Sequence, residues 1–275
     1  MKRSGPLTPP NAPAPGAPAR PRPAFPARLD TSVPAPVNRP GASAVAATRR
    51  VAAPVAVTSG IGMDSLAVRQ SMVRKLQAQD ISHPAVLAAM LAVERHRFVD
   101  TALAPQAYED TSLPIGLGQT ISKPSVVARM LELLCHGKTE KLGRVLDIGT
   151  GCGYQATVLS HLAREVYSIE RLRGLHEKAR DNLRAFRLAN VHLLFGDGML
   201  GYPQGAPYAG IVAAAGGNDV PQAWIEQLAV GGRLVAPAVT GSGQQHLVVM
   251  EKTSQGVTRS VLEPVLFVPL KSGIA

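Results

Sequence analysis

The stretch that decides the fold is Val145-Leu-Asp-Ile-Gly-Thr-Gly-Cys-Gly-Tyr154. Its first residues have the apolar character of a short buried strand, three glycines follow as a tight turn, and a helical pattern begins at Tyr154. Gly149, Gly151 and Gly153 permit backbone angles that other residues avoid, and they let a ligand approach the main chain closely. Such a strand, turn and helix is typical of a doubly wound sheet, in which ligands bind at the carboxyl ends of the strands.

Strands and helices alternate around this stretch. Apolar residues at helical spacing predict helices over 64–79, 84–93, 124–134, 154–162, 172–186 and 221–228. Strands are predicted over 144–148, 166–169, 191–195, 210–214 and 233–238, and an antiparallel hairpin over 246–251 and 257–268 around the turn 254–256. We therefore expect an α/β fold with a doubly wound, mostly parallel sheet, N-terminal helices and a C-terminal antiparallel hairpin.

Composition divides the chain into two parts. Residues 1–60 hold 13 of the 23 prolines, eight Lys or Arg and a single acid, so they carry +7 of the net charge of +10. They have almost no periodic apolar pattern, and we expect a disordered Pro/Ala/Arg-rich basic tail before one domain over 61–275. Three interpretations of the tail stay open: no specific partner, weak electrostatic contact with nucleic acid or an anionic surface, and translation that starts at Met63.

The rest of the composition argues against several classes of protein. Because most of the positive charge lies in the tail, a basic core that binds nucleic acid is not indicated. No run approaches the length of a membrane span, and the first 30 residues lack the apolar centre of a signal peptide. Cys135 and Cys152 lack metal-ligand spacing, as do the histidines, so we expect no metal site and a reducing, cytoplasmic setting.

Acidic residues lie at or near the ends of three successive strands. Asp147 precedes the first glycine by two positions, Glu170 ends the next strand about twenty residues later, and Asp197 follows the third strand. Dinucleotide sites space their glycines G-x-G-x-x-G to receive a pyrophosphate, whereas the spacing here is G-x-G-x-G. Carboxylates without a pyrophosphate site suit a cationic nucleoside, so the sequence indicates S-adenosylmethionine, with Glu170 on the ribose and Asp197 near adenine. The alternative is a turn that serves strand–helix packing alone.

A segment rich in neutral polar groups precedes the glycine turn. It reads Leu113-Pro-Ile-Gly-Leu-Gly-Gln-Thr-Ile-Ser-Lys-Pro124, and we expect a loop that forms the substrate-holding edge of the pocket. The hydroxyls of Thr120 and Ser122 can hold a carboxylate without neutralising it. Ser122 also has a second interpretation, as the cap of the helix predicted from 124.

Several of these segments resemble one family. Residues 110–124, 145–155, 190–198 and 266–270 are similar to protein-L-isoaspartate O-methyltransferases, and the resemblance extends over about 68–271. It implies a Rossmann-like class I methyltransferase that uses S-adenosylmethionine to methylate the α-carboxylate of isoaspartyl residues in damaged proteins and peptides. It implies Ser122 as the active-site residue, with Thr120 beside it. The residues expected to hold the cofactor are Asp147, Gly149, Thr150, Gly151, Gly153, Glu170, Asp197 and Gly198.

The expected chemistry needs no general base, because an α-carboxylate is already ionised at pH 7. Catalysis would consist of placing its oxygen in line with the methyl group and removing its water. The chain departs from the family pattern at Ala209, where an acid is usual, and at 214–217, where a hydroxyl and a proline are usual. These departures motivate two alternatives: a methyltransferase of another substrate, and a catalytically silent relative that acts as a binding protein. We expect a monomer.

Overall fold

The computed structural model describes residues 66–275, in which a seven-stranded sheet holds most of the core. The predictions for the tail over 1–60 and for the first residues of the helix over 64–79 lie outside this part of the chain. The strands of the large sheet are β3 (Leu142–Ile148), β4 (Ala163–Glu170), β5 (Val191–Phe195), β6 (Tyr208–Ala213), β7 (Leu228–Val239), β8 (Gln245–Thr253) and β9 (Gly256–Pro264). The helices are α1 (Leu66–Gln77), α2 (Pro84–Ala92), α3 (Pro124–Cys135), α4 (Tyr154–Leu162), α5 (Arg173–Arg184) and α6 (Gln222–Gln227), with short 3-10 helices η1 (Arg95–Phe98), η2 (Thr101–Gln106), η3 (Gly198–Leu200) and η4 (Pro203–Gly205).

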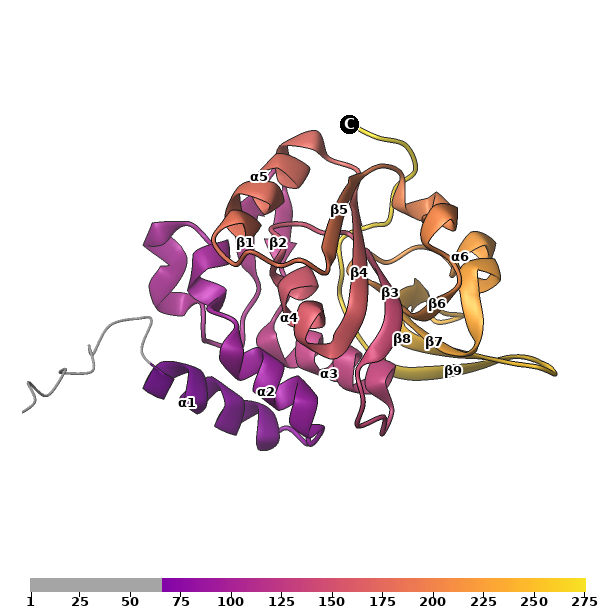
Figure 1. Cartoon of the computed structure of the whole chain (residues 1–275), viewed down its shortest axis with the longest axis horizontal. Helices are drawn as coiled ribbons and strands as arrows, with labels where there is room; N and C mark the ends of the chain where they lie inside the picture. The colour runs from indigo at the N-terminus through magenta and orange to yellow at the C-terminus, as the bar shows by residue number, and fades with distance from the viewer. Residues whose placement is uncertain (1–65) are drawn as a thin grey trace, which may run out of the picture. The chain divides into compact units, whose positions relative to one another are not determined.

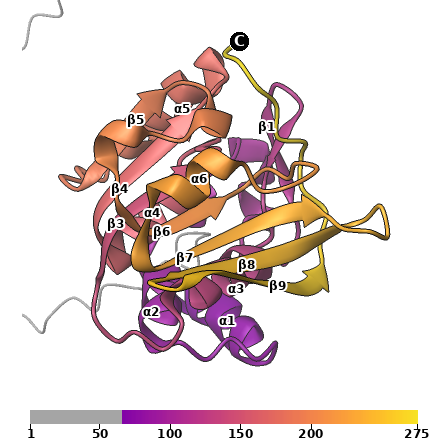
Figure 2. The ribbon, with the colours of Figure 1, turned by 90° about the vertical axis from the view of Figure 1, so that its right-hand side faces the viewer.

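The strand order is β5-β4-β3-β6-β7-β8-β9, and the first five strands of this order are parallel. β7, β8 and β9 are joined as antiparallel neighbours, and this side of the sheet faces the viewer in Figure 2. The order reverses beside β3, so the turn after β3 lies at the switch point of a doubly wound sheet. The α/β prediction, including the C-terminal antiparallel hairpin, is therefore confirmed.

Two buried clusters cover the two faces of the sheet. Alternate residues of β3 belong to different clusters: Val145 packs with α1 to α4, and Leu146 packs with Trp224 of α6. This division follows from the period of two along a strand, and it explains why the strands read as nearly continuous apolar runs. The helices α1, α2 and α3 lie together beside α4 in Figure 1, on the side of the sheet away from α6.

The segment predicted as a polar loop is instead a small antiparallel hairpin, β1 (Leu113–Gly116) and β2 (Gln119–Ile121). Its inward residues, Leu113, Ile115 and Ile121, are buried, whereas its turn has positive φ angles at 116, 117 and 118. Two glycines make that turn possible, since they adopt positive φ without a steric penalty. The short strands were missed because prolines and glycines in a sequence favour a loop assignment.

The last strand is shorter than predicted, because β9 ends at Pro264 and not at 268. Val265 N still donates to Gln245 O, at the start of β8, at 2.9 Å, whereas Leu270 N donates to Gly216 O, beyond β6, at 2.8 Å. The segment 265–270 therefore crosses to the carboxyl end of β6. There it becomes part of the wall of the main cavity.

Candidate active site

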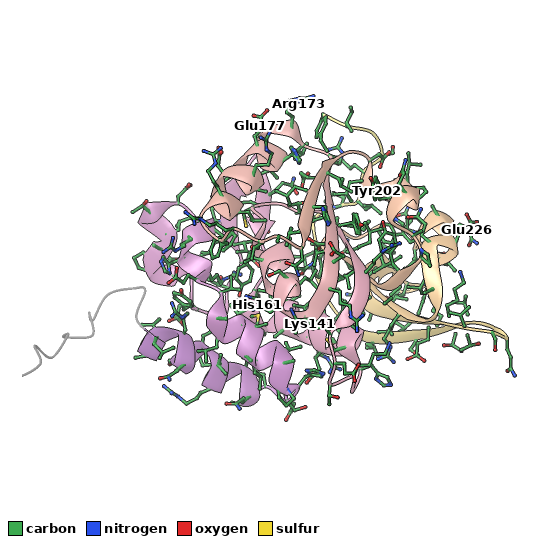
Figure 3. All side chains as sticks on the ribbon, in the orientation of Figure 1. Lys141, His161, Arg173, Glu177, Tyr202 and Glu226 are labelled. Atoms are coloured by element: carbon green, nitrogen blue, oxygen red, sulfur yellow. The ribbon has the colours of Figure 1, made fainter. Side chains whose placement is uncertain are left out.

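The main cavity lies at the carboxyl ends of β3, β4 and β6 and has a volume of about 380 Å³. Figure 3 labels Arg173, at the start of α5, at this end of the molecule, and Lys141 and His161 near the opposite ends of the strands. The main cavity is lined by the hairpin, the glycine turn, the end of β4 and the segment 268–271. Five of the predicted site residues are among the lining residues: Thr120, Gly149, Gly151, Glu170 and Gly198.

The glycine turn is held under this cavity by the neighbouring strand. The amides of Gly149 and Thr150 both donate to the carbonyl of Ile169, at 2.9 and 3.2 Å. Gly149 has a φ of 90°, which side-chain-bearing residues rarely adopt. Gly153 does not face the cavity: a Cβ there would stand 2.4 Å from Leu183 Cδ1, so this glycine allows α4 to pack closely against α5.

Glu170 joins the glycine turn to the end of β4. Its Oε2 accepts from Gly151 N and its Oε1 accepts from Leu172 N, both at 2.9 Å. The residue is 6% exposed and lines the cavity. Each carboxylate oxygen keeps a further lone pair, so Glu170 can also accept hydrogen bonds from a ligand's hydroxyl groups.

Asp147 lies beneath the turn and does not line either of the cavities described for this site. It is fully buried, with Gln155 Nε2 donating to Oδ1 at 2.8 Å and Ser168 Oγ donating to Oδ2 at 2.7 Å. Thr150 Oγ1 lies 2.7 Å from the same serine oxygen, which extends the network to the turn itself. Burial raises the pKa of Asp147 to about 6, and the two hydrogen bonds oppose that rise. In this structure Asp147 therefore holds the turn from below.

Asp197 is bound on both sides by backbone amides. Its Oδ1 accepts from Met199 N at 2.8 Å, which caps η3, and its Oδ2 accepts from Gly273 N at 2.6 Å. The segment 273–275 continues along β4's end, with Ala275 N donating to Arg171 O and Arg173 N donating to Ala275 O. This last part of the chain, yellow in Figure 1, lies beside α5. Asp197 thus ties that segment to the wall of the cavity.

A second, much smaller cavity of about 40 Å³ adjoins the first between the hairpin and the glycine turn. Thr120, Ser122 and Thr150 line it, and Thr120 also lines the main cavity. Its lining contains no carboxylate, histidine or lysine. Cys152 and Tyr154 do line it, but burial raises the pKa of both, in Tyr154 to about 12. This cavity can orient a polar group, but it offers no general base.

Ser122 does not cap the helix that follows it. The residue before α3 is Lys123, which makes no side-chain cap, and Asp110 accepts from Ser125 N and Ser125 Oγ at 2.9 and 2.8 Å. Within residues 66–275 the Ser122 hydroxyl has no hydrogen-bond partner, while its carbonyl accepts from Arg95 Nη2 at 2.7 Å. The Ser122 side chain is therefore available to a ligand in the small cavity.

Sequence reasoning missed several residues that build the site. Arg95 and Lys178 hold the hairpin through the carbonyls of Ser122 and Ile115, and a single cation in a sequence carries no signal of such a contact. The segment 266–270 was singled out only through the family resemblance, and nothing in its composition indicates that residues 268–271 form a cavity wall. Leu117 at the turn of the hairpin also lines the main cavity and was read only as part of a polar loop.

The departures from the family pattern fall in two separate places. Ala214 lines both cavities, so the end of β6 does flank the site. Ala209 lies at the beginning of β6 and lines neither of these two cavities; a Cβ on Gly143 would approach its side chain to 3.3 Å. Local packing explains the glycine at position 216, because a Cβ there would stand 2.7 Å from Gln245 Nε2.

The main cavity fits an adenosyl cofactor. Its volume lies within the range of small-molecule sites, and Gly149, Gly151 and Gly198 in its lining leave room for a ligand close to the main chain. Glu170 supplies the acceptor expected for a ribose. Such a site at the switch point of this sheet defines a Rossmann-like class I methyltransferase, a class that depends on S-adenosylmethionine.

Comparison with known proteins gives the family within this class. The sequence model described as protein-L-isoaspartate(D-aspartate) O-methyltransferase matches residues 67–275. This chain is 55% identical over 264 residues to a protein-L-isoaspartate O-methyltransferase of Methylibium petroleiphilum, which covers 92% of this chain and 97% of the relative. It is 57% identical over 225 residues to one of Burkholderia vietnamiensis, covering 81% and 72%. The chain belongs to the protein-L-isoaspartate(D-aspartate) O-methyltransferase family, and the resemblance read from the sequence is confirmed.

Solved structures agree. A protein-L-isoaspartate O-methyltransferase matches with a TM-score of 0.68 at 28% identity, over 75% of this chain and 67% of its own. A Plasmodium falciparum structure, titled as a putative member in complex with S-adenosyl-L-homocysteine, has a TM-score of 0.66 at 23% identity and covers 74% of this chain and 98% of its own. The second likeness shows the fold.

Proposed function

We propose that this chain transfers a methyl group from S-adenosylmethionine to the α-carboxylate of L-isoaspartyl residues in damaged proteins and peptides. The observation that carries the proposal is the small cavity beside the glycine turn, which Thr120, Ser122 and Thr150 line and whose lining contains no carboxylate, histidine or lysine. A nucleophile that is already ionised needs orientation and no proton transfer, and an α-carboxylate is such a nucleophile at pH 7.

In this proposal Ser122 and Thr120 are the catalytic residues. Their hydroxyls donate hydrogen bonds to the substrate carboxylate, and the buried hairpin residues behind them exclude water. The glycine turn allows the carboxylate to approach the main cavity, since Gly149 and Gly151 line both spaces. Orientation and loss of water are the two contributions this arrangement makes to the rate.

The cofactor supplies an electrophilic methyl group on a positively charged sulfur when it is bound. Gly149, Gly151, Glu170 and Gly198 would contact it, because they line the main cavity. Asp147, Thr150 and Gly153 would act beneath the turn by fixing its shape, and Asp197 would act at the adenine end. We assign no other cofactor to this chain.

We further propose that 61–275 is the methyltransferase domain, that it works as a monomer, and that the tail over 1–60 is dispensable for catalysis. Deletion of 1–60 should leave methyl transfer unchanged, and sedimentation should give the mass of one chain. A cytoplasmic location is supported by Cys135 and Cys152, which are both free and buried. Among residues 66–275 no helix is long and apolar enough to cross a membrane, and no three His, Cys, Asp or Glu side chains are grouped to hold a metal.

A paired-peptide assay tests the proposal. The full chain is given radiolabelled S-adenosylmethionine and two peptides that differ only in Asp or isoAsp at one position. Label on the isoAsp peptide alone is the expected result. Cofactor binding without transfer to either peptide would overturn the assigned substrate and favour the two alternatives, another substrate or a binding protein without activity.

A further inference from the structure

Arg95 is a fully buried cation next to the site. It lies in η1, where its Nε donates to Ala107 O at 2.8 Å and its Nη2 donates to Ser122 O at 2.7 Å. Its Nη1 is buried and has no hydrogen-bond partner within residues 66–275. Carbonyl oxygens satisfy hydrogen bonds but do not neutralise a charge. Burial accordingly lowers the pKa of this guanidinium, as it disfavours the charged form.

The structure shows no carboxylate paired with this charge. None of the ion pairs in the described part of the chain includes Arg95. Asp110 acts on it electrostatically, but the oxygens of Asp110 accept from Ser125. The guanidinium instead lies 4.8 Å from the centre of the Tyr154 ring, a cation–π contact. A buried cation without an anion is costly, so its position calls for an explanation.

Arg95 contacts three residues, Ala107, Ser122 and Tyr154, and the last two line the small cavity. Arg95 itself lines neither this cavity nor the main one. It therefore stands directly behind the hairpin and the start of α4. Ser122 and Tyr154 therefore lie between Arg95 and the small cavity, where the proposed function places the substrate's carboxylate.

We propose that Arg95 is a positioning residue and the counter-charge of the substrate: it fixes the backbone of Ser122 and balances the α-carboxylate that enters the small cavity. The inference rests on the proposed function. A cavity lined by neutral groups disfavours a charged ligand because the ligand loses its hydration. A cation behind the lining offsets that loss, since charges interact strongly where water is excluded.

Peptide binding measures this charge directly. Calorimetry with S-adenosyl-L-homocysteine present compares an isoaspartyl peptide with the same peptide carrying an α-carboxamide at that residue. Wild type should bind the carboxylate at least tenfold more tightly. In Arg95→Met the ratio should fall to about one, whereas Arg95→Lys should keep most of the ratio but lose kcat, because an ammonium cannot hold both carbonyls as the guanidinium does.

Arg97→Met is the matched control, since Arg97 is a partly exposed arginine of the same η1 that lines neither cavity. It should leave the ratio, and the affinity for S-adenosyl-L-homocysteine, unchanged. If Arg95 has only a structural role, Arg95→Met will lower the affinity for both peptides by the same factor and leave the ratio of the two affinities unchanged. That result would overturn the proposal.

The wild-type ratio decides the matter even if Arg95→Met does not fold: equal affinity for the two peptides overturns the proposal. Wild type that methylates no isoaspartyl peptide is a different failure, seen before any variant is made, and it overturns the proposed function together with this inference.

Discussion

The ammonium of Lys178 on α5 donates a hydrogen bond of 2.8 Å to the backbone carbonyl of Ile115 on β1. Ile115 is buried and lines both cavities, so this bond joins the β1–β2 hairpin to the helix that follows β4. Arg95 holds the other end of the hairpin through the carbonyl of Ser122, the residue that follows β2. Two cations outside the cavities thus set the orientation of the hairpin.

Lys178→Met should therefore reduce catalysis more than stability. The bond is charge-assisted and partly screened, and its loss should cost about 1–2 kcal/mol. Because the hairpin is free to shift, we expect kcat/KM for the isoaspartyl peptide to fall about tenfold, with a fall in Tm of only a few degrees. Steady-state kinetics and thermal unfolding measure the two effects.

Lys75→Met is the control for Lys178→Met, because Lys75, in the last turn of α1, makes an exposed ion pair with Glu109. Exposed pairs contribute about 0–1 kcal/mol, so this variant should match wild type in both measurements. If Lys178→Met also kept the wild-type kcat/KM, the bond to Ile115 would have no part in positioning the hairpin.

Ser122→Ala should abolish most of the activity without destabilising the protein. The hydroxyl of Ser122 has no hydrogen-bond partner within residues 66–275, so folding loses nothing when it is removed. We expect kcat to fall on the order of 10²-fold, as for other groups that orient a reacting atom, and Tm to stay within about a degree.

Ser125→Ala provides the opposite case in the same segment. Ser125 lies in the first turn of α3, and its hydroxyl donates to Asp110. Loss of this contact should cost about 1 kcal/mol of unfolding free energy. Activity per folded molecule should persist. Wild-type turnover by a folded Ser122→Ala protein would remove Ser122 from the catalytic residues.

Much of this fold could be predicted from the sequence, and the reason is local. The turn at 149–153 needs its glycines, and the apolar runs of β3 and β6 match strands buried on both faces. The hairpin β1–β2 could not be predicted in this way, since its strands are short and it is held by contacts with Arg95 and Lys178, which are distant in sequence. Such contacts leave no periodic signal.

The same distinction applies to the acidic residues of the site. Their positions at the ends of strands followed from spacing, and Glu170 does line the cavity. Which way a carboxylate points depends on the donors that surround it. Asp147 accepts hydrogen bonds from Gln155 and Ser168 below the turn, and Asp197 accepts one from Gly273 N. Neither orientation could be predicted from the strand pattern.

Asp147→Asn should change how stability depends on pH. Burial raises the pKa of Asp147 from its ordinary 3.8 to about 6, so the folded protein binds this proton more tightly than the unfolded chain. That contribution is complete below pH 4 and is lost as the pH rises through about 6. Asparagine does not titrate, and it still accepts from Gln155 while Ser168 turns its hydroxyl toward Thr150.

The free energy of unfolding of Asp147→Asn, relative to wild type, should thus increase between pH 4 and pH 7, by at most about 3 kcal/mol for a shift of this size. Urea unfolding at several pH values measures it. A difference that stays constant over this range would show that Asp147 titrates as an ordinary carboxyl group.

Asp197→Asn should speed the release of S-adenosyl-L-homocysteine. An asparagine still caps η3 through Oδ1, but its Nδ2 cannot accept from Gly273 N, so the segment 273–275 loses its tie to the cavity wall. That segment also pairs with Arg171 and Arg173 beside the cavity. We expect the dissociation rate to rise severalfold, with Tm changed by no more than a few degrees.

Removal of 273–275 should raise the dissociation rate at least as much, because it breaks the contact with Asp197 and also the hydrogen bonds to Arg171 and Arg173. The double change should then add nothing further, since two alterations of one interaction are not additive. Stopped-flow measurement of dissociation from the four proteins completes the cycle. If Asp197 instead contacts the cofactor directly, Asp197→Asn will exceed the deletion, and the two effects will add.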